Sequence, residues 1–329
     1  MEYRDFGNSG IKLSRIGLGC FGMSGAYGVA DDAESIATIH EAMEHGVNLI
    51  DTSARYGGGH NHRLIGKAIK GRREQVFIHS KTGTIRDESD RSVAAGSGAP
   101  DRLRDICETS LKNLGVDYLD TMCQSRVDPT IPIEESVGAV SRLVEEGKVR
   151  FVGLSEAAPN TIRRASKVHP LVSLQFEYSL WTRDVEDGHH DTCNELGMAL
   201  MAYAPLGYGF LTGVVNTAGA QSEDDIRGKF PRFHEVNYSA NRECVSQLEG
   251  FASDKGATPA QISLAWLLAQ NDNVFPIPGC KSRKHLLENL GAIDISLTKE
   301  DLIRLAKIFH QNAVEGDRYP PNGMKRVNL

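Results

Sequence analysis

Short apolar runs alternate with longer segments of helical character along most of this chain. Eight of these runs have the length and composition of β-strands: 16–18, 47–51, 76–81, 118–124, 149–155, 172–177, 199–203 and 274–277. Strands that alternate with helices form parallel sheets, and eight such units close a barrel. The alternation therefore predicts an α/β protein with the (β/α)8 architecture of a TIM barrel.

Capping and turn residues support the same assignment. Pro100 and Gly115 mark the start and the stop of one helix, and Thr258 precedes a proline at the first turn of another. The helices that we predict in detail cover 33–45, 100–114, 133–147, 160–168 and 258–269. Near the N-terminus, residues 3–6 and 12–13 flank a Gly-Asn-Ser-Gly turn, which predicts a β-hairpin over the lower end of the barrel.

Two long polar connections, 85–99 and 208–237, each follow a predicted strand and therefore belong to the C-terminal face of the barrel. No linker, repeat or low-complexity tract interrupts the pattern, so we expect residues 1–329 to form a single domain. A barrel of this class needs about 250 residues, which the chain exceeds.

Composition narrows the class of function. The net charge of −6 argues against a nucleic-acid partner, which requires a basic surface. The charged N-terminus and the lack of a long apolar run predict a cytoplasmic protein without a signal peptide or membrane span. The six cysteines have no metal-ligand spacing. We expect a small-molecule substrate, and the pattern leaves the oligomeric state open.

Three reactive side chains meet at the predicted barrel rim. Asp51 and Tyr56 follow the second strand, and Lys81 ends the third. A lysine near a tyrosine favours the phenolate and lowers the phenol pKa, while an aspartate keeps the lysine charged and oriented. Tyr56 could then give a proton to a carbonyl oxygen. On these positions alone, a buried ion pair beside an unrelated tyrosine is an equally good interpretation.

Several motifs in order connect this rim to a known family. They lie at residues 17–23, 51–57, 153–156, 175–180, 203–213, 277–281 and 288–289. Over 3–319 the chain resembles the aldo-keto reductases, and in particular the bacterial, fungal and plant branch that carries Gln-His-Arg-x-Asp on strand four. The resemblance implies a catalytic set of Asp51, Tyr56, Lys81 and a histidine. In this chain Ser125 stands where the family has that histidine.

The serine alters the expected chemistry. Loss of one donor to a developing oxyanion costs about 10²–10³ in rate in well-studied sites. A serine has one donor but a shorter reach, so a water could bridge it to the substrate. His79 shares a strand face with Lys81, one layer deeper. We expect it either to fill space left by Ser125, bonding Lys81, Cys123, Ser125 or water, or to be an ordinary core histidine.

The resemblance also implies NADP(H) as the cofactor. There is no Gly-x-Gly-x-x-Gly motif, so a Rossmann site is not indicated. Small residues near the pyrophosphate and a basic cluster near a 2′-phosphate suit this cofactor. The implied cofactor residues are Phe21, Gly22, Ser155, Gln175, Tyr203, Pro205, Leu206, Gly207, Gly209, Lys281, Ser282, Arg283, His285, Glu288 and Asn289. At position 156 this chain has a glutamate, where most aldo-keto reductases have an asparagine.

Histidines and aromatic residues outside these motifs are further candidates for functional roles. His189, His190 and Cys193 lack the partners of a zinc site, so we expect no metal. His60 is a weak candidate for a substrate gate. Rim aromatics would shape an apolar substrate pocket, and they are Phe21, Tyr27, Trp181 and Tyr208.

The predicted function is NADPH-dependent reduction of an aldehyde or ketone to an alcohol, or the reverse. Two alternatives stay open because of Ser125: a low-turnover NADP(H)-binding sensor, and altered chemistry such as C=C reduction.

Overall fold

Eight parallel strands follow one another around a closed barrel. The computed structural model describes residues 1–84, 93–215 and 225–329. The strands are β3 (Leu18–Gly19), β4 (Leu49–Ser53), β5 (Phe77–Lys81), β6 (Leu119–Gln124), β7 (Val149–Ser155), β8 (Leu171–Glu177), β9 (Ala199–Tyr203) and β10 (Val274–Pro276). The backbone N–H of Gly17 donates to Pro276 (3.0 Å) and that of Gly19 to Pro278 (3.1 Å), which joins the first strand to the last. The predicted barrel is confirmed.

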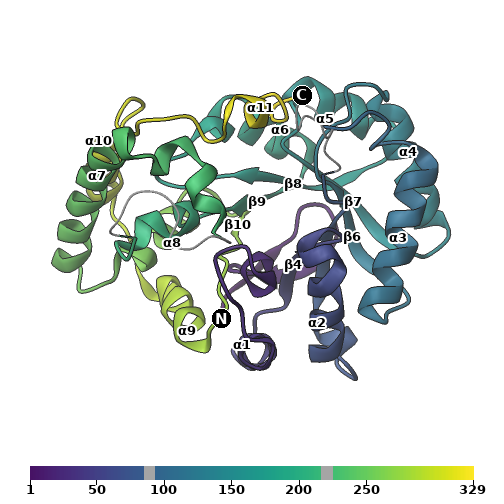
Figure 1. Cartoon of the computed structure of the whole chain (residues 1–329), viewed down its shortest axis with the longest axis horizontal. Helices are drawn as coiled ribbons and strands as arrows, with labels where there is room; N and C mark the ends of the chain where they lie inside the picture. Colours follow the sequence, from purple (N-terminus) through teal and green to yellow (C-terminus); the bar gives the residue numbers. More distant parts are fainter. Residues whose placement is uncertain (85–92, 216–224) are drawn as a thin grey trace.

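Helices surround the strands as an outer ring (Figure 1). They are α1 (Asp32–Glu44), α2 (His60–Ala68), α3 (Pro100–Leu114), α4 (Ile133–Glu145), α5 (Pro159–Ser166), α6 (His189–Leu196), α7 (Glu235–Asp254), α8 (Pro259–Leu268), α9 (Arg283–Leu290), α10 (Lys299–Ile308) and α11 (Pro321–Met324). The predicted start and stop of α3 are confirmed: Pro100 opens it, and Gly115 caps it in the left-handed region at φ 66°.

The N-terminal hairpin covers the lower end of the barrel, as predicted. Strands β1 (Tyr3–Asp5) and β2 (Lys12–Ser14) pair antiparallel. Phe6 and Leu13 are buried in a cluster with residues from the beginnings of the strands, including Leu49, Phe77 and Phe275. Because the lower end is filled by apolar side chains, only the upper rim can open to a ligand.

The C-terminal face carries the irregular connections. Parts of both long loops, residues 85–92 and 216–224, lie outside the described residues. The described parts of the second loop form short 3-10 turns, η5 (Gly207–Thr212), η6 (Ile226–Lys229) and η7 (Pro231–Phe233). Within the described ranges, no helix has both the length and the apolar character to cross a membrane.

The end of the chain lies over the same face. The N–H of Asn328 donates to the carbonyl of Glu156, and the N–H of Ala158 donates to the carbonyl of Leu329, both at 2.8 Å. These bonds attach residues 318–329, which we call the C-terminal arm, to the loop after β7. The upper rim is thus formed by strand ends, irregular turns and the arm.

Candidate active site

Asp51 and Lys81 form a close buried pair at the upper rim. Neighbouring parallel strands β4 and β5 carry them, and Lys81 Nζ lies 2.6 and 2.5 Å from the two Asp51 carboxylate oxygens. Burial opposes ionisation of Asp51, but Lys81 and a hydrogen bond from His79 outweigh it and lower the Asp51 pKa. Burial also opposes the charge on Lys81, yet Asp51 raises its pKa. Both groups are therefore ionised at neutral pH.

Tyr56 lies directly after β4, with Lys81 Nζ 5.1 Å from its ring centre. Burial raises the pKa of Tyr56 to about 12, and Lys81 only partly offsets this effect. The expected net lowering of the phenol pKa is therefore wrong, because the tyrosine is desolvated along with the ion pair. Tyr56 is a neutral phenol at physiological pH, which is the form that can donate a proton.

His79 lies below this pair and is fully buried. Its Nδ1 is 3.2 Å from Asp51 Oδ1, and its Nε2 is 3.2 Å from Ser173 Oγ on β8. A carboxylate only accepts, so Nδ1 donates to Asp51, and Nε2 accepts from the serine. Lys81, Cys123 and Ser125 are not its partners, which corrects that expectation. The imidazole spans the barrel to Ser173 instead.

Ser125 follows β6 and lines the upper cavity. Its hydroxyl oxygen accepts from the N–H of Gly83 at 2.7 Å, and its own N–H donates to Thr82 Oγ1 at 3.1 Å. Its hydroxyl hydrogen is left to donate elsewhere. The next residue, Arg126, donates to the Ser125 carbonyl (2.6 Å) and to Ser155 Oγ (3.3 Å).

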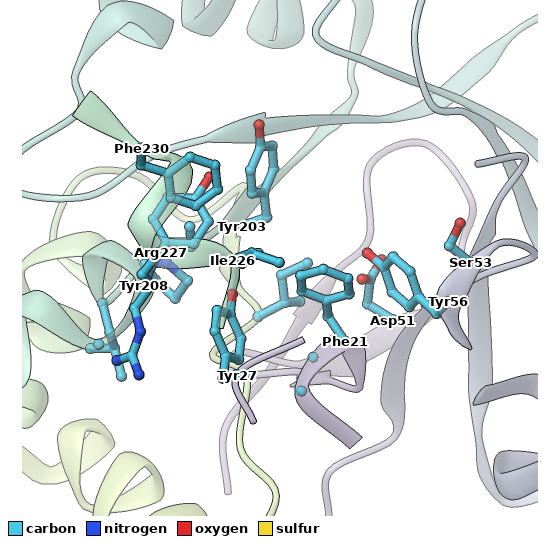
Figure 2. A pocket seen from close by; sticks show the side chains of 18 of the residues that line it. Phe21, Tyr27, Asp51, Ser53, Tyr56, Tyr203, Tyr208, Ile226, Arg227 and Phe230 are labelled. Atoms are coloured by element: carbon cyan, nitrogen blue, oxygen red, sulfur yellow. The ribbon is translucent and has the colours of Figure 1, made fainter. Parts of the chain in front are cut away.

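One cavity of about 1390 Å³ joins these groups to the far side of the rim. Figure 2 shows Asp51 and Tyr56 on one side of it and Tyr208, Arg227 and Phe230 on the other. Of the implied cofactor residues, those that line it are Phe21, Gly22, Ser155, Gln175, Tyr203, Pro205, Leu206, Gly209, Lys281, His285, Glu288 and Asn289. The sequence-predicted catalytic and cofactor groups thus share one continuous space.

Three implied cofactor residues do not line this cavity. Gly207 (φ 56°) packs against the Trp181 ring, where a Cβ would approach ring atoms to 2.6 Å. Ser282 caps α9 through the N–H of His285, and Arg283 forms an ion pair with Glu34 at 3.0 Å. Lys281 faces the cavity but donates to two backbone carbonyls, at 2.8 and 3.1 Å. Any role of these residues in phosphate binding stays a prediction.

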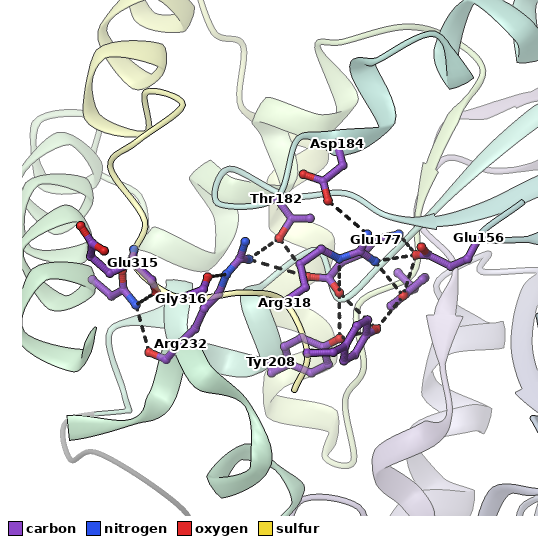
Figure 3. A network of polar contacts seen from close by, with 12 residues as sticks. Glu156, Glu177, Thr182, Asp184, Tyr208, Arg232, Glu315, Gly316 and Arg318 are labelled. Carbon is purple, nitrogen blue, oxygen red and sulfur yellow. Dashed lines mark hydrogen bonds and ion pairs between the residues drawn. The ribbon is translucent and has the colours of Figure 1, made fainter. Parts of the chain in front are cut away.

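The cavity also has a wall that the sequence motifs did not indicate. Arg318, 2% exposed, lies 2.6 Å from Glu156 and 3.3 Å from Glu177, both fully buried (Figure 3). The Tyr203 hydroxyl donates to Glu156 at 2.7 Å and lies 2.8 Å from the Tyr319 hydroxyl. Glu156 is thus engaged by the C-terminal arm and does not line the cavity. Nothing local in the sequence identifies Arg318 or Tyr319, which are more than a hundred residues from their partners.

The remaining candidates have structural surroundings. His60 Nδ1 is 3.0 Å from Ser24 Oγ and its Nε2 is 3.1 Å from Asp32, so neither nitrogen faces the cavity. His189 bonds Asn328 at 3.0 Å. No group of metal-ligating side chains is gathered among residues 1–84, 93–215 and 225–329. Phe21, Tyr27 and Tyr208 line the cavity, whereas Trp181 is buried behind η5.

Comparison with known proteins identifies the family. The model of the Aldo/keto reductase family matches residues 15–309. The probable aldo-keto reductase 1 of Glycine max is 40% identical over 316 residues, which are 95% of this chain and 90% of that protein. Among solved structures, the glycerol dehydrogenase of Gluconobacter oxydans has a TM-score of 0.83 at 26% identity and covers 95% of this chain and 97% of its own.

An aldo/keto reductase of Klebsiella pneumoniae, solved with NADP and acetate, has a TM-score of 0.75 at 25% identity, covering 97% and 99% of the two chains. The family model spans the strands of the barrel, and the relative and the two solved structures each cover at least 95% of this chain. This chain belongs to the aldo/keto reductase family.

Proposed function

We propose that this protein reduces an aldehyde or ketone to an alcohol, or catalyses the reverse reaction, with NADP(H) as its redox partner. The observation that carries the proposal is the buried Asp51–Lys81 pair beside a neutral Tyr56. A family relative solved with NADP supports the choice of cofactor. The cavity also supports this choice of cofactor, because it connects the site with residues after β10.

The cavity suits the cofactor in its polar groups as well as in its extent. Gln175 donates to Asp51 at 2.6 Å, and no described residue donates to its amide oxygen. Ser155 accepts from Arg126 and keeps its hydroxyl hydrogen for another acceptor. One acceptor and one donor side by side match a carboxamide. Lys281 and His285 line the same cavity after β10, where a phosphate would be held.

When bound, NADPH supplies a hydride to the carbonyl carbon. Tyr56 gives its proton to the carbonyl oxygen, which thereby becomes the alcohol hydroxyl. Lys81 stabilises the phenolate that Tyr56 leaves behind, and Asp51 keeps Lys81 charged and in place. The Ser125 hydroxyl supplies the remaining hydrogen bond toward the oxygen, directly or through a water.

Turnover and binding need separate measurements. NADPH binding should be followed by calorimetry, and NADPH oxidation with a panel of aldehydes and ketones by absorbance, for the wild type, Tyr56→Phe and Ser125→His. We expect binding in all three, a loss of 10²–10⁴-fold in rate for Tyr56→Phe, and a gain for Ser125→His.

Each negative result has its own meaning. Binding without turnover of any substrate, unchanged by Ser125→His, would favour the sensor alternative. Absence of NADPH binding would refute both functions.

A further inference from the structure

Among the described residues, the cavity is lined by far more cations than carboxylates. Its basic residues are Arg55, Lys81, Arg126, Arg227, Lys229, Lys281 and Arg326, and its acidic residues are Asp51 and Glu288. Lys81 is paired with Asp51, and Arg227 with Asp225 at 2.6 Å. Arg126, Lys229 and Lys281 form no ion pair with any described residue, and they lie at two separate locations along the barrel.

One location agrees with the predicted cofactor phosphates. Lys281 follows β10 and Lys229 ends η6, on the side of the rim that the family motif assigns to the cofactor tail. Arg126 lies elsewhere, because it follows β6, four strands away from β10 in the barrel order. A dinucleotide whose phosphates lie near β9 and β10 does not account for a cation beside β6.

Arg126 has no carboxylate in direct contact among the described residues; Glu156 acts on it only from beyond ion-pair distance. Its guanidinium is partly buried, and its hydrogen bonds go to the Ser125 carbonyl and to Ser155 Oγ, both neutral. Within the described ranges no Asp or Glu forms an ion pair with it. Burial of a guanidinium that has no direct ion-pair partner is costly, and its five fixed donors fit a carboxylate in two-point contact.

A second arginine, Arg55, lies in the same cavity as Arg126 and close to Ser125 and Tyr56. The stem of Arg55 packs on Gly83, whose N–H donates to Ser125 Oγ at 2.7 Å. Arg55 is thus linked to Ser125 through Gly83, and Arg55, Ser125 and Arg126 all line the same cavity. A serine occupies less space than the imidazole of the family pattern, so a substrate group can approach both arginines next to Tyr56.

We propose that Arg126, assisted by Arg55, binds a carboxylate of the substrate, so that the preferred substrates are carbonyl compounds that carry an acid group. This inference rests on the proposed reductase function. It names Arg126 as a specificity residue whose charge, rather than its bulk, selects the substrate.

The test compares each acid with its own methyl ester. The substrate pairs are 4-oxobutanoate with methyl 4-oxobutanoate, and 2-carboxybenzaldehyde with methyl 2-formylbenzoate, followed by NADPH oxidation. We expect the acid-to-ester ratio of kcat/KM to fall at least tenfold in Arg126→Gln, since a charge-assisted hydrogen bond is lost. Arg126→Lys should recover part of the ratio. Arg304→Gln, which breaks an exposed pair with Asp254, is the matched control and should not alter it.

A ratio that stays the same in Arg126→Gln, even if both rates fall, would overturn the proposal and leave the reductase function intact. A second readout does not depend on turnover. Benzoate is titrated by calorimetry into the protein saturated with NADP⁺, and we expect at least tenfold weaker binding to Arg126→Gln. Equal affinity, or no binding to the wild type, would also overturn it. Arginine-dependent benzoate binding without reduction of any carbonyl would instead refute the proposed function alone.

Discussion

Replacement of Arg318 by methionine tests whether the C-terminal arm holds the barrel rim by charge. Arg318 is 2% exposed and lies within 3.3 Å of two fully buried carboxylates, Glu156 and Glu177. Methionine keeps most of the apolar stem and removes the cation. Glu177 retains Arg232 at 4.0 Å, whereas Arg318 is the one ion-pair partner of Glu156 among the described residues. Arg318→Met therefore leaves Glu156 buried with no cation in contact.

Removal of one partner of a buried ion pair costs about 3–5 kcal/mol. The unfolding entropy of about 2.1 cal/mol/K per residue gives about 0.7 kcal/mol/K for 329 residues, so Tm should fall by about 4–7 °C. The assay is urea denaturation of the cofactor-free protein at pH 7.5, followed by circular dichroism. Arg304→Met, in an exposed pair with Asp254, is the control, with an expected change under about 0.5 kcal/mol.

The pH dependence and a double variant identify the cause. In the wild type, Arg318 and Arg126 outweigh burial and hold the pKa of Glu156 below its ordinary range. The ionised carboxylate therefore stabilises the fold above about pH 4.3, and this contribution is lost as the pH falls. In Arg318→Met the larger of these two attractions is lost, so burial should raise the Glu156 pKa above its wild-type value and the deficit should shrink between pH 7.5 and pH 5. Glu156→Gln combined with Arg318→Met should recover at least about 1 kcal/mol. A deficit below about 1 kcal/mol at pH 7.5, or no recovery in the double variant, would refute the reasoning.

Three further predictions concern the site itself. The reductive kcat should stay flat from pH 6 to pH 9, because the proton of Tyr56 is lost only near its pKa of about 12; a fall with a midpoint near 7 or 8 in a pH–rate profile would contradict this. Lys281→Met should raise the calorimetric Kd for NADPH about 10- to 100-fold and leave that for NADH within threefold, and an equal change in both would exclude a 2′-phosphate contact. His79→Ala should lower the free energy of unfolding by about 2–4 kcal/mol in urea denaturation, because it leaves a cavity and removes a hydrogen-bond donor to Asp51. It should also lower kcat. Unchanged stability and rate would show that His79 is dispensable.

Strand and helix positions were predictable where local pattern and tertiary packing agree. The predicted ranges 149–155, 199–203 and 100–114 coincide with β7, β9 and α3, each of which has a regular apolar pattern or clear end signals. The first strand was placed two residues too early, since β3 is only Leu18–Gly19 and its ends depend on pairing with its neighbours on either side. The common location of Asp51, Tyr56 and Lys81 at one rim was predictable, because each lies in or next to the C-terminal end of a neighbouring strand.

Charge states and long-range contacts were not predictable in this way. The sequence places Lys81 near Tyr56, which alone would lower the phenol pKa, but the degree of burial is a property of the whole rim and reverses the sign. One of the two partners of His79, Ser173, lies on β8, because the imidazole reaches across the interior of the barrel. Strand alternation correctly predicted that His79 faces the barrel interior, but it could not predict which residue across the interior forms a hydrogen bond with it.

Glu156 and Glu177 show why carboxylates at strand ends do not by themselves indicate catalysis. Both follow or end barrel strands at the C-terminal face, which is where catalytic acids occur in this architecture. Both nevertheless form ion pairs with Arg318, which lies beyond the 15–309 region that the family model matches, and Glu177 also lies 4.0 Å from Arg232. The same contacts place the hydroxyl of Tyr319 against that of Tyr203 in the cavity wall. The arm therefore balances the charge of the rim and shapes the substrate cavity, so that changes in residues 318–329 should act on stability and specificity together.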